Sequence, residues 1–330
     1  MLGLLLKNVP ALYRFSVLIN WSCKNFKFLP GNFSGIFNYK KPLLLHRSTI
    51  QLLRFPFSYF LMPVFWFAVS LVDMINVPRA ILVFVILHVI VYPSSNGYNS
   101  YMDRDTESIG GLETPPAPTK QLFYITIIMD VVAILLSMFI SSIFVTCIVI
   151  YIIFSRLYSY RGVRLKQFPL LGYLTVIFNQ GSLTFFMVYH AVDSNLTTHM
   201  SWLGLLAAAF LIGGFYPITQ VYQHEADAKD NITTISMKMG KKGTFIFCAI
   251  MYMMAMLLLW SFYKSHELYR PFIVLLIFFF PVIVYFIQWF LKVWKNERLA
   301  DFKHTMQMNW LASTCTSLAF ITIILLQKFG

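Results

Sequence analysis

A short acidic stretch interrupts a largely apolar part of the chain. The stretch "NSYMDRDTE" (residues 99–107) directly follows residues 79–98, which are mostly apolar and contain no acid. Within it, Asn99, Asp103 and Glu107 recur at intervals of four residues, a spacing that places side chains on one face of a helix. Hard oxygen ligands of this kind suit Mg²⁺, which typically binds one or two carboxylates together with substrate phosphates.

A second acidic stretch has a similar spacing. The stretch "TQVYQHEADAKD" (residues 219–230) places Gln223, Asp227 and Asp230 at intervals of four and three residues. One such stretch is as often solvated surface as it is a binding site. Two stretches with the same helical spacing favour a paired binding site.

A basic stretch lies between the two acidic ones. The segment "SYRGVRLKQFP" (residues 159–169) carries Arg161, Arg164 and Lys166, and such side chains bind phosphate oxygens directly. Two carboxylates about 4 Å apart repel by roughly 4 kcal/mol at an effective dielectric of 20, so a cation is expected between them. The three stretches together indicate Mg²⁺ and a phosphorylated substrate.

The composition assigns these stretches to a membrane protein. Of the 330 residues, 58% are hydrophobic and 12% are charged, whereas a soluble domain carries about 25% charged residues. The mean hydropathy is +0.68. A transmembrane helix needs roughly 20 consecutive apolar residues. We therefore predict an all-α polytopic membrane protein with about nine spans, at residues 55–73, 79–98, 121–140, 142–158, 169–191, 202–222, 243–263, 270–293 and 308–327.

The distribution of charge predicts the orientation of these spans. The net charge is +13, and most of the 26 Lys and Arg residues fall in the N-terminal segment and in the loops after spans two, four, six and eight. The positive-inside rule places these segments in the cytoplasm, together with both acidic stretches and the basic one. The positive charge is thus a topology signal and does not indicate nucleic-acid binding.

The first 50 residues differ from the rest of the chain. Residues 11–27 place polar side chains opposite apolar ones at helical spacing, which predicts an amphipathic helix lying on the membrane surface. We expect residues 1–50 to form this interfacial segment and a linker, and residues 51–330 to form the nine-helix domain.

The motifs resemble those of the UbiA superfamily of intramembrane prenyltransferases. "NSYMDRDTE" resembles its first aspartate-rich motif, and "QHEADAKDNITTISMKMG" (residues 223–240) resembles its second. "YSYRGVRLKQFPLLG" (residues 158–172) is similar to the basic loop between them, and "LLRFPFSYFLMP" (residues 52–63) to the start of the first helix. The resemblance covers roughly residues 52–325. It implies a helical bundle around a central cavity that binds a polyprenyl diphosphate donor and Mg²⁺ near the cytoplasmic face.

The resemblance also implies roles for individual residues. Asn99, Asp103 and Glu107 match the first metal motif, with Glu where the family usually has Asp. Asp227 and Gln223 match the second, with Gln where the family usually has Asp. The expected catalytic residues are Asp103, Asp227 and Lys166.

The expected diphosphate contacts are basic. Lys166 and Arg164 match the basic loop, and Arg104 is the candidate to replace an Arg that many members carry soon after the first motif. Glu225 or Asp230 could substitute for the missing carboxylate at position 223.

Three further side chains have two interpretations each. His224, like Glu225, flanks the second motif and could act as an acid or base on the acceptor, or lie in solvent. Tyr98 could border an aromatic acceptor or belong to an interfacial aromatic belt. His88 could line the cavity or be a core histidine with satisfied hydrogen bonds.

An acidic side chain within a span needs its own explanation. Asp130 lies in the third predicted span and has no obvious partner in the sequence. Intramembrane acids are usually functional, but this one could instead hydrogen-bond a neighbouring helix.

The expected function is Mg²⁺-dependent transfer of a polyprenyl group from its diphosphate to a small, usually aromatic acceptor, in contact with membrane lipid. A cation-coupled transporter is the alternative from another class. Transporters bind their ions near the bilayer midplane, whereas both acidic stretches here follow the cytoplasmic ends of spans. An inactive relative of the enzyme is a third possibility, based on Gln223 and the missing Arg.

Overall fold

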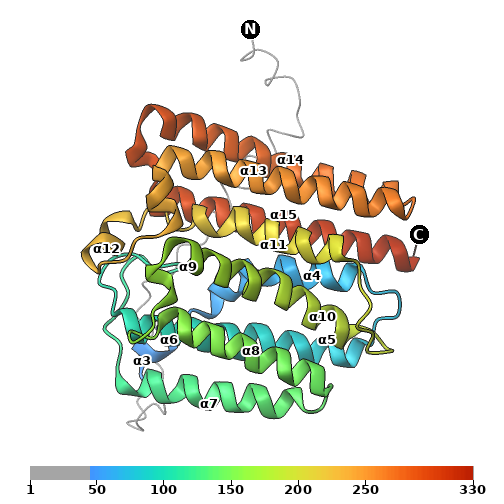
Figure 1. The fold of residues 1–330 in the computed structure, drawn as a ribbon, viewed down its shortest axis with the longest axis horizontal. Coiled ribbons are helices and arrows are strands. Elements are labelled where there is room, and N and C mark those ends of the chain that lie inside the picture. The colour runs from blue at the N-terminus through green and yellow to red at the C-terminus, as the bar shows by residue number, and fades with distance from the viewer. Residues whose placement is uncertain (1–44, 330) are drawn as a thin grey trace, which may run out of the picture. The chain divides into compact units, whose positions relative to one another are not determined.

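The computed structural model describes residues 45–329, and these form a nearly all-helical bundle (Figure 1). The predicted amphipathic segment at residues 11–27 lies outside the described residues. Within the described part of the chain, eight helices are long and apolar enough to cross a membrane. A ninth apolar helix, α11, is shorter, with 17 residues. The predicted all-α class and the prediction of about nine helices are confirmed.

The first half of the bundle consists of five membrane-length helices, three of which are built from consecutive segments. The first comprises α3 (Arg47–Leu52), the 3₁₀ segment η2 (Phe55–Leu61) and α4 (Met62–Ser70). The second comprises α5 (Val77–Phe84), the π-helical segment η3 (Val85–Val91) and α6 (Tyr92–Asp103). Then follow α7 (Lys120–Ser137), α8 (Ser142–Ser159), the short η4 (Leu165–Gln167), and the fifth helix, made of α9 (Pro169–Val176), the π-helical η5 (Ile177–Leu183) and α10 (Thr184–Val192).

The second half contains four long helices and two short ones. These are α11 (Trp202–Ile218), the short α12 (His224–Lys229), α13 (Ile235–Ser265), α14 (Tyr269–Lys295), the short η6 (Glu297–Leu299) and α15 (Phe302–Phe329). Helix α11 packs against α13 and η5, and α15 packs against α4 and α14.

The spans predicted at residues 121–140 and 142–158 are two separate helices joined by a short turn. Helix α7 ends at Ser137 and α8 begins at Ser142. Ser141 caps α8, since its side chain accepts a hydrogen bond from the backbone N–H of Phe144 at 3.0 Å. A serine at this position satisfies one of the N–H groups that the first helical turn leaves free. The apolar run is therefore two helices and not one long helix.

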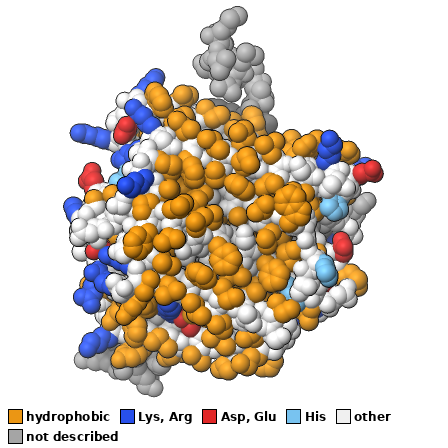
Figure 2. All heavy atoms as spheres, viewed as in Figure 1, with side chains coloured by type: hydrophobic (Ala, Val, Ile, Leu, Met, Phe, Trp, Pro, Cys, Tyr) orange, Lys and Arg blue, Asp and Glu red, His pale blue; other side chains and the backbone are white. Residues whose placement is uncertain are grey.

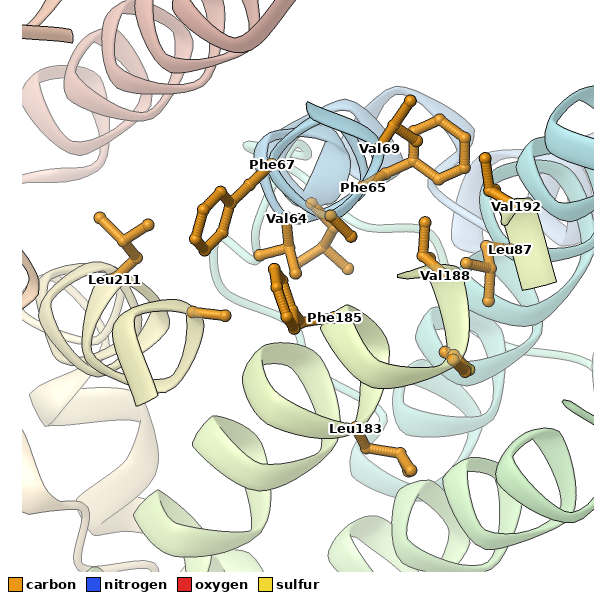
Figure 3. Packing of buried hydrophobic residues seen from close by; sticks show 14 of the residues in the cluster. Val64, Phe65, Phe67, Val69, Leu87, Leu183, Phe185, Val188, Val192 and Leu211 are labelled. Carbon is orange, nitrogen blue, oxygen red and sulfur yellow. The ribbon is translucent and has the colours of Figure 1, made fainter. Parts of the chain in front are cut away.

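Helix α4 is the central element of the core. Its side chains Val64, Phe65, Phe67 and Val69 are buried and point in several directions into the bundle (Figure 3). The ring of Phe67 lies 4.8 Å from that of Phe185 in α10 and 4.7 Å from that of Phe320 in α15. This packing ties the first helix to both halves of the bundle and so fixes where the segment before α4 lies.

Charged side chains gather at one end of the bundle. Figure 2 shows Lys and Arg concentrated at the left, where Figure 1 places α12, and a broad apolar surface across the middle of this face. This is the distribution that the sequence predicts for loops on one side of a membrane.

Asp130 has a partner in the next helix. Its carboxylate pairs with the guanidinium of Arg156 in α8 and accepts a hydrogen bond from Ser94 in α6 at 2.6 Å. Arg156 also lies over the ring of Tyr98, 4.0 Å from its centroid. Both charged side chains are mostly buried. The structure thus supports hydrogen bonding to a neighbouring helix as the role of Asp130, which joins α6, α7 and α8.

Loss of one partner of this pair should destabilise the protein. We expect Asp130→Ala to cost about 3–5 kcal/mol, because it leaves the Arg156 guanidinium buried without a counter-charge. The measurement is thermal unfolding of the purified protein in detergent.

Two variants test the cause of that loss. Asp130→Leu combined with Arg156→Leu should recover most of the stability, since it removes both charges. The exposed Glu113→Ala should change stability by no more than about 0.5 kcal/mol. An unchanged melting temperature for Asp130→Ala would contradict the structural role of the pair.

Candidate functional site

Helix α6 delivers Asp103 to the basic loop. The helix ends at this residue because Arg104 adopts a left-handed conformation, with φ of 56°. The Asp103 side chain is only 3% exposed. One of its oxygens pairs with the Lys166 ammonium, and the other accepts a hydrogen bond from Arg164 Nη2 at 3.3 Å.

Arg164 joins the two acidic stretches. Besides Asp103, its guanidinium pairs with the carboxylate of Asp230 and donates from Nη1 to the Asp230 carbonyl oxygen at 3.3 Å. Burial alone would raise the pKa of Asp230, but the hydrogen bond and the charge of Arg164 outweigh it and lower that pKa. One buried arginine therefore holds the end of α6 next to the end of α12.

A polar cavity of about 180 Å³ opens beside Asp103 and Lys166, and neither Arg164 nor Asp230 lines it. Its lining includes the carboxylates of Asp103, Asp105 and Asp227 and the cations of Arg54 and Lys166. Side-chain amides also line it, including two from the π-helical η5, a helix distortion that is frequent at functional sites. The amides are those of Asn96, Asn99, Asn179, Gln180, Gln220 and Gln223.

Two of the three carboxylates have no partner among the described residues. Neither Asp105 nor Asp227 forms a side-chain hydrogen bond or an ion pair within residues 45–329. Burial, together with the negative charge of Asp103, raises the pKa of Asp105 to about 6. Burial, opposed by Lys166 and reinforced by the charges of Asp105 and Asp103, raises the pKa of Asp227 to about 7. The cavity thus holds an excess of negative charge that a cation would neutralise.

The structure brings together most of the predicted metal-binding residues. Asn99, Asp103, Gln223, Asp227 and the basic Lys166 all line the polar cavity. Asn99 Nδ2 donates to Ser159 Oγ at 2.9 Å, and Gln223 Nε2 donates to the Ser108 carbonyl oxygen at 3.4 Å. Both amides therefore keep their oxygen free to bind a ligand.

Glu107 lies elsewhere. The prediction that it shares a helix face with Asn99 and Asp103 is wrong, because α6 ends at Asp103 and the chain then leaves the helix. The Glu107 carboxylate accepts a hydrogen bond from Lys229 at 2.6 Å on the exposed side of α12.

Several other predicted residues also lie outside the lining of the cavity. Arg104 is exposed, and Glu225 is exposed on α12. Tyr98 is buried below Arg156 on another face of α6. His88 is buried in η3, where its ring stacks on that of Phe84 at 4.4 Å.

His224 is half-buried beside the cavity. Its Nε2 lies 2.8 Å from Ser236 Oγ. Burial, and then the charge of Lys241, lowers the pKa of His224 to about 4. The ring is therefore neutral at physiological pH.

Arg54 is a cavity residue that the sequence analysis did not identify. It is 8% exposed, and its guanidinium donates to the Gly110 carbonyl oxygen at 3.3 Å and to the Asn96 carbonyl oxygen at 3.3 Å. It forms no ion pair with a carboxylate in the described part of the chain. A charged residue within the otherwise apolar run "LLRFPFSYF" was the available signal. A buried cation without a counter-ion is costly, so an anion is the expected ligand.

An apolar cavity of about 450 Å³ adjoins the polar one. Side chains of the first helix and of α11, α13, α14 and α15 line it, among them Phe60, Met253 and Phe286. Phe215 of α11 lines both cavities. A molecule with a charged head and an apolar tail could therefore occupy the two together.

The donor set of the polar cavity fits Mg²⁺. Among residues 45–329, no three Asp, Glu, His or Cys side chains form a cluster that could hold a metal ion by themselves. Mg²⁺ does not need one, because it commonly binds one or two carboxylates and completes its shell with phosphate and water. The unpaired Asp105 and Asp227 and the free amide oxygens of Asn99 and Gln223 match this requirement.

A comparison with family models and a comparison with solved structures both match UbiA proteins. A sequence model of the UbiA prenyltransferase family matches residues 60–312. A UbiA homolog from Archaeoglobus fulgidus, solved with GPP and Mg²⁺ bound, is similar in fold, with a TM-score of 0.63 at 17% identity over 84% of this chain and 99% of that one. An apo UbiA homolog from Aeropyrum pernix K1 has a TM-score of 0.61 at 16% identity, with coverage of 84% and 99%. A digeranylgeranylglyceryl phosphate synthase has a TM-score of 0.56 at 18% identity, with coverage of 84% and 97%. No curated protein sequence matches the chain.

Metal binding at this cavity should depend on pH. A carboxylate must lose its proton to bind a metal, and the pKa of Asp227 is about 7. We expect the affinity for Mn²⁺, a spectroscopic substitute for Mg²⁺, to level off above pH 7, to fall by about tenfold from pH 7 to pH 6, and to fall more steeply below pH 6, where Asp105 is protonated as well. Electron paramagnetic resonance titrations measure this affinity.

A variant provides the control for this titration. Asp227→Asn should move the inflection toward about pH 6, the pKa of Asp105. In the absence of metal, the contribution of Asp227 to the stability of the fold changes with pH in the opposite direction to the Mn²⁺ affinity. The raised pKa of Asp227 favours the folded state at low pH, and this contribution is lost as the pH rises through 7. An Mn²⁺ affinity that does not change between pH 5 and 8 would contradict the assignment.

Proposed function

The chain belongs to the UbiA prenyltransferase family, and we propose that it transfers a polyprenyl group from a polyprenyl diphosphate to a small aromatic acceptor, in an Mg²⁺-dependent reaction on the cytoplasmic side of the membrane. The observation that carries this proposal is the junction of two cavities. A polar cavity with unpaired carboxylates and buried cations adjoins an apolar cavity more than twice its volume.

The polar cavity has the charges that a diphosphate requires. Lys166 and Arg54 both line it, and Arg54 has no carboxylate partner within residues 45–329. The carboxylates and amide oxygens that line the cavity would hold Mg²⁺. When bound, the ion supplies positive charge where negative charge develops on the leaving diphosphate.

The reaction would proceed by departure of the diphosphate. The C–O bond of the donor breaks, its electron pair leaves with the diphosphate, and an allylic cation remains. An electron-rich acceptor ring attacks this cation, a new C–C bond forms, and the ring then releases a proton. Phe215, at the junction of the cavities, and Tyr158 and Tyr216 in the polar one could shield the cation through their ring faces.

The apolar cavity would hold the isoprenoid tail. Its residues come from helices that cross the apolar part of the bundle, so the tail would lie parallel to the lipid chains. The eight apolar helices and the family make this an integral membrane protein. The excess of Lys and Arg beside the polar cavity supports its cytoplasmic orientation.

The enzyme assay is a direct test. Purified protein should release diphosphate from geranylgeranyl and longer polyprenyl diphosphates when Mg²⁺ and a pool of aromatic acceptors are present. Asp103→Asn and Asp227→Asn should each lower kcat by about 100-fold or more, since each weakens the stabilisation of the leaving diphosphate.

Controls distinguish a metal-dependent enzyme from a transporter and from an inactive relative. The exposed Glu225→Gln should retain activity. Equal turnover in EDTA would exclude a metal-dependent mechanism. Cation uptake into vesicles driven by a gradient, without diphosphate release, would favour a transporter. Metal binding without either activity would favour an inactive relative, with Gln223 as the first residue to examine.

A second variant tests the tail cavity. Ala249 lines this cavity, so Ala249→Phe should reduce its length. We expect kcat/KM for the longest accepted donor to fall by about 10- to 200-fold relative to a short donor, the discrimination that a hydrophobic pocket provides. Ile250→Phe, at an exposed neighbouring position outside the lining, is the matched control. An equal loss for short and long donors would contradict the assignment.

A further inference from the structure

Two acids of the first acidic stretch, Asp105 and Glu107, are candidates for the same metal-binding position. The resemblance to the family assigns Glu107 as the later carboxylate ligand of this stretch. We propose that Asp105 binds the divalent cation in its place, opposite Asp227. This inference rests on the proposed function, because it names the carboxylate that completes the same metal site.

Glu107 is unsuited to the role by its position. The left-handed Arg104 ends α6, so the helical spacing that would align Glu107 with Asp103 no longer applies. Its side chain is 46% exposed and pairs with Lys229, which is itself 71% exposed. Glu107 also does not line the polar cavity. Its carboxylate would have to leave a surface ion pair and turn inward to reach a metal.

Asp105 already meets the requirements. It lines the polar cavity together with Asp227, and its carboxylate has no hydrogen bond or ion pair within residues 45–329. Lys166 and Arg54 act on it only through their charge, since neither lies within ion-pair distance. A half-buried carboxylate without a partner is unfavourable, and a bound cation would remove that cost.

Asp103 is less available than Asp105. Both of its carboxylate oxygens are already occupied, one by Lys166 and one by Arg164. Metal binding through Asp103 must share or displace these contacts, whereas binding through Asp105 and Asp227 displaces none. The most available pair of carboxylates in the cavity is therefore Asp105 and Asp227.

A buried amide oxygen also points to a ligand at this site. Gln220 is 5% exposed and lines the same cavity. Its Nε2 donates to the Tyr216 hydroxyl at 2.7 Å, and its Oε1 has no hydrogen-bond partner among the described residues. Two carboxylates and a neutral oxygen would balance the charge of one divalent cation.

The experiment compares two isosteric variants in the full-length protein. Mn²⁺ binding is measured by electron paramagnetic resonance, alone and with inorganic diphosphate, for Asp105→Asn and Glu107→Gln. We expect the Kd for Mn²⁺ to rise at least tenfold in Asp105→Asn, which is the size of effect seen when a metal ligand or a residue supporting it is lost. In Glu107→Gln the Kd should stay within about twofold of the wild-type value.

Thermal unfolding distinguishes a lost ligand from a damaged fold. Asp105→Asn removes an unpaired charge, so its melting temperature without metal should equal or exceed that of the wild type. The increase in melting temperature on adding Mn²⁺ should disappear in this variant and persist in Glu107→Gln. The opposite pattern, or normal Mn²⁺ binding by Asp105→Asn, would overturn the proposal.

The binding assay is independent of turnover. A wild type that transfers prenyl groups while Asp105→Asn binds Mn²⁺ normally would refute the assignment of Asp105 alone. Loss of Mn²⁺ binding in Asp105→Asn, with no transfer by the wild type, would support that assignment and refute the proposed function. A wild type that binds no Mn²⁺, with or without diphosphate, would refute both.

Discussion

The site depends on two arginines of the basic loop, Arg161 and Arg164, which hold two acidic segments together. Arg164 contacts Asp103, 61 residues earlier in the chain, and Asp230, 66 residues later. Without a cation between them, the carboxylates at the ends of α6 and α12 would repel one another and the cavity would tend to open. Because Arg164 and Lys166 satisfy Asp103 and Asp230, the carboxylates that line the polar cavity without a hydrogen bond or ion pair are those of Asp105 and Asp227. The basic loop thus determines which acids remain available to a ligand.

The apolar bundle determines where this charged site lies. Helices that cross a membrane place their polar residues at their ends, and α6 and α11 both end at the polar cavity. The same helices border the apolar cavity or pack against those that do, and Phe215 marks the junction. An amphiphilic substrate suits this arrangement because its head and tail would meet matching surroundings. Arg54 contributes a buried cation from the first helix, which the packing of Phe67 holds in the middle of the bundle.

Local sequence patterns predict much of this arrangement. The features that they miss depend on backbone conformation or on contacts between residues that are far apart in the chain. Hydropathy predicted the helices because a span needs a continuous apolar run. Helical spacing within each acidic stretch indicated a paired site, and Asp103 and Asp227, one from each stretch, line one cavity. It failed for Glu107, because a left-handed residue ended the helix and nothing in local spacing reveals such a turn. The pairing of Asp130 with Arg156, 26 residues away, was likewise a tertiary contact that periodicity cannot show.

We propose that a polyprenyl diphosphate occupies both cavities and that a divalent cation holds its head. Binding of a non-reactive geranylgeranyl thiodiphosphate to the purified protein can be measured by calorimetry, with and without Mg²⁺. We expect tight binding only when Mg²⁺, the diphosphate head and the long tail are all present. Inorganic diphosphate or geranylgeraniol should bind far more weakly. Equal binding of the thiodiphosphate in EDTA, or equal binding of the alcohol, would contradict this proposal.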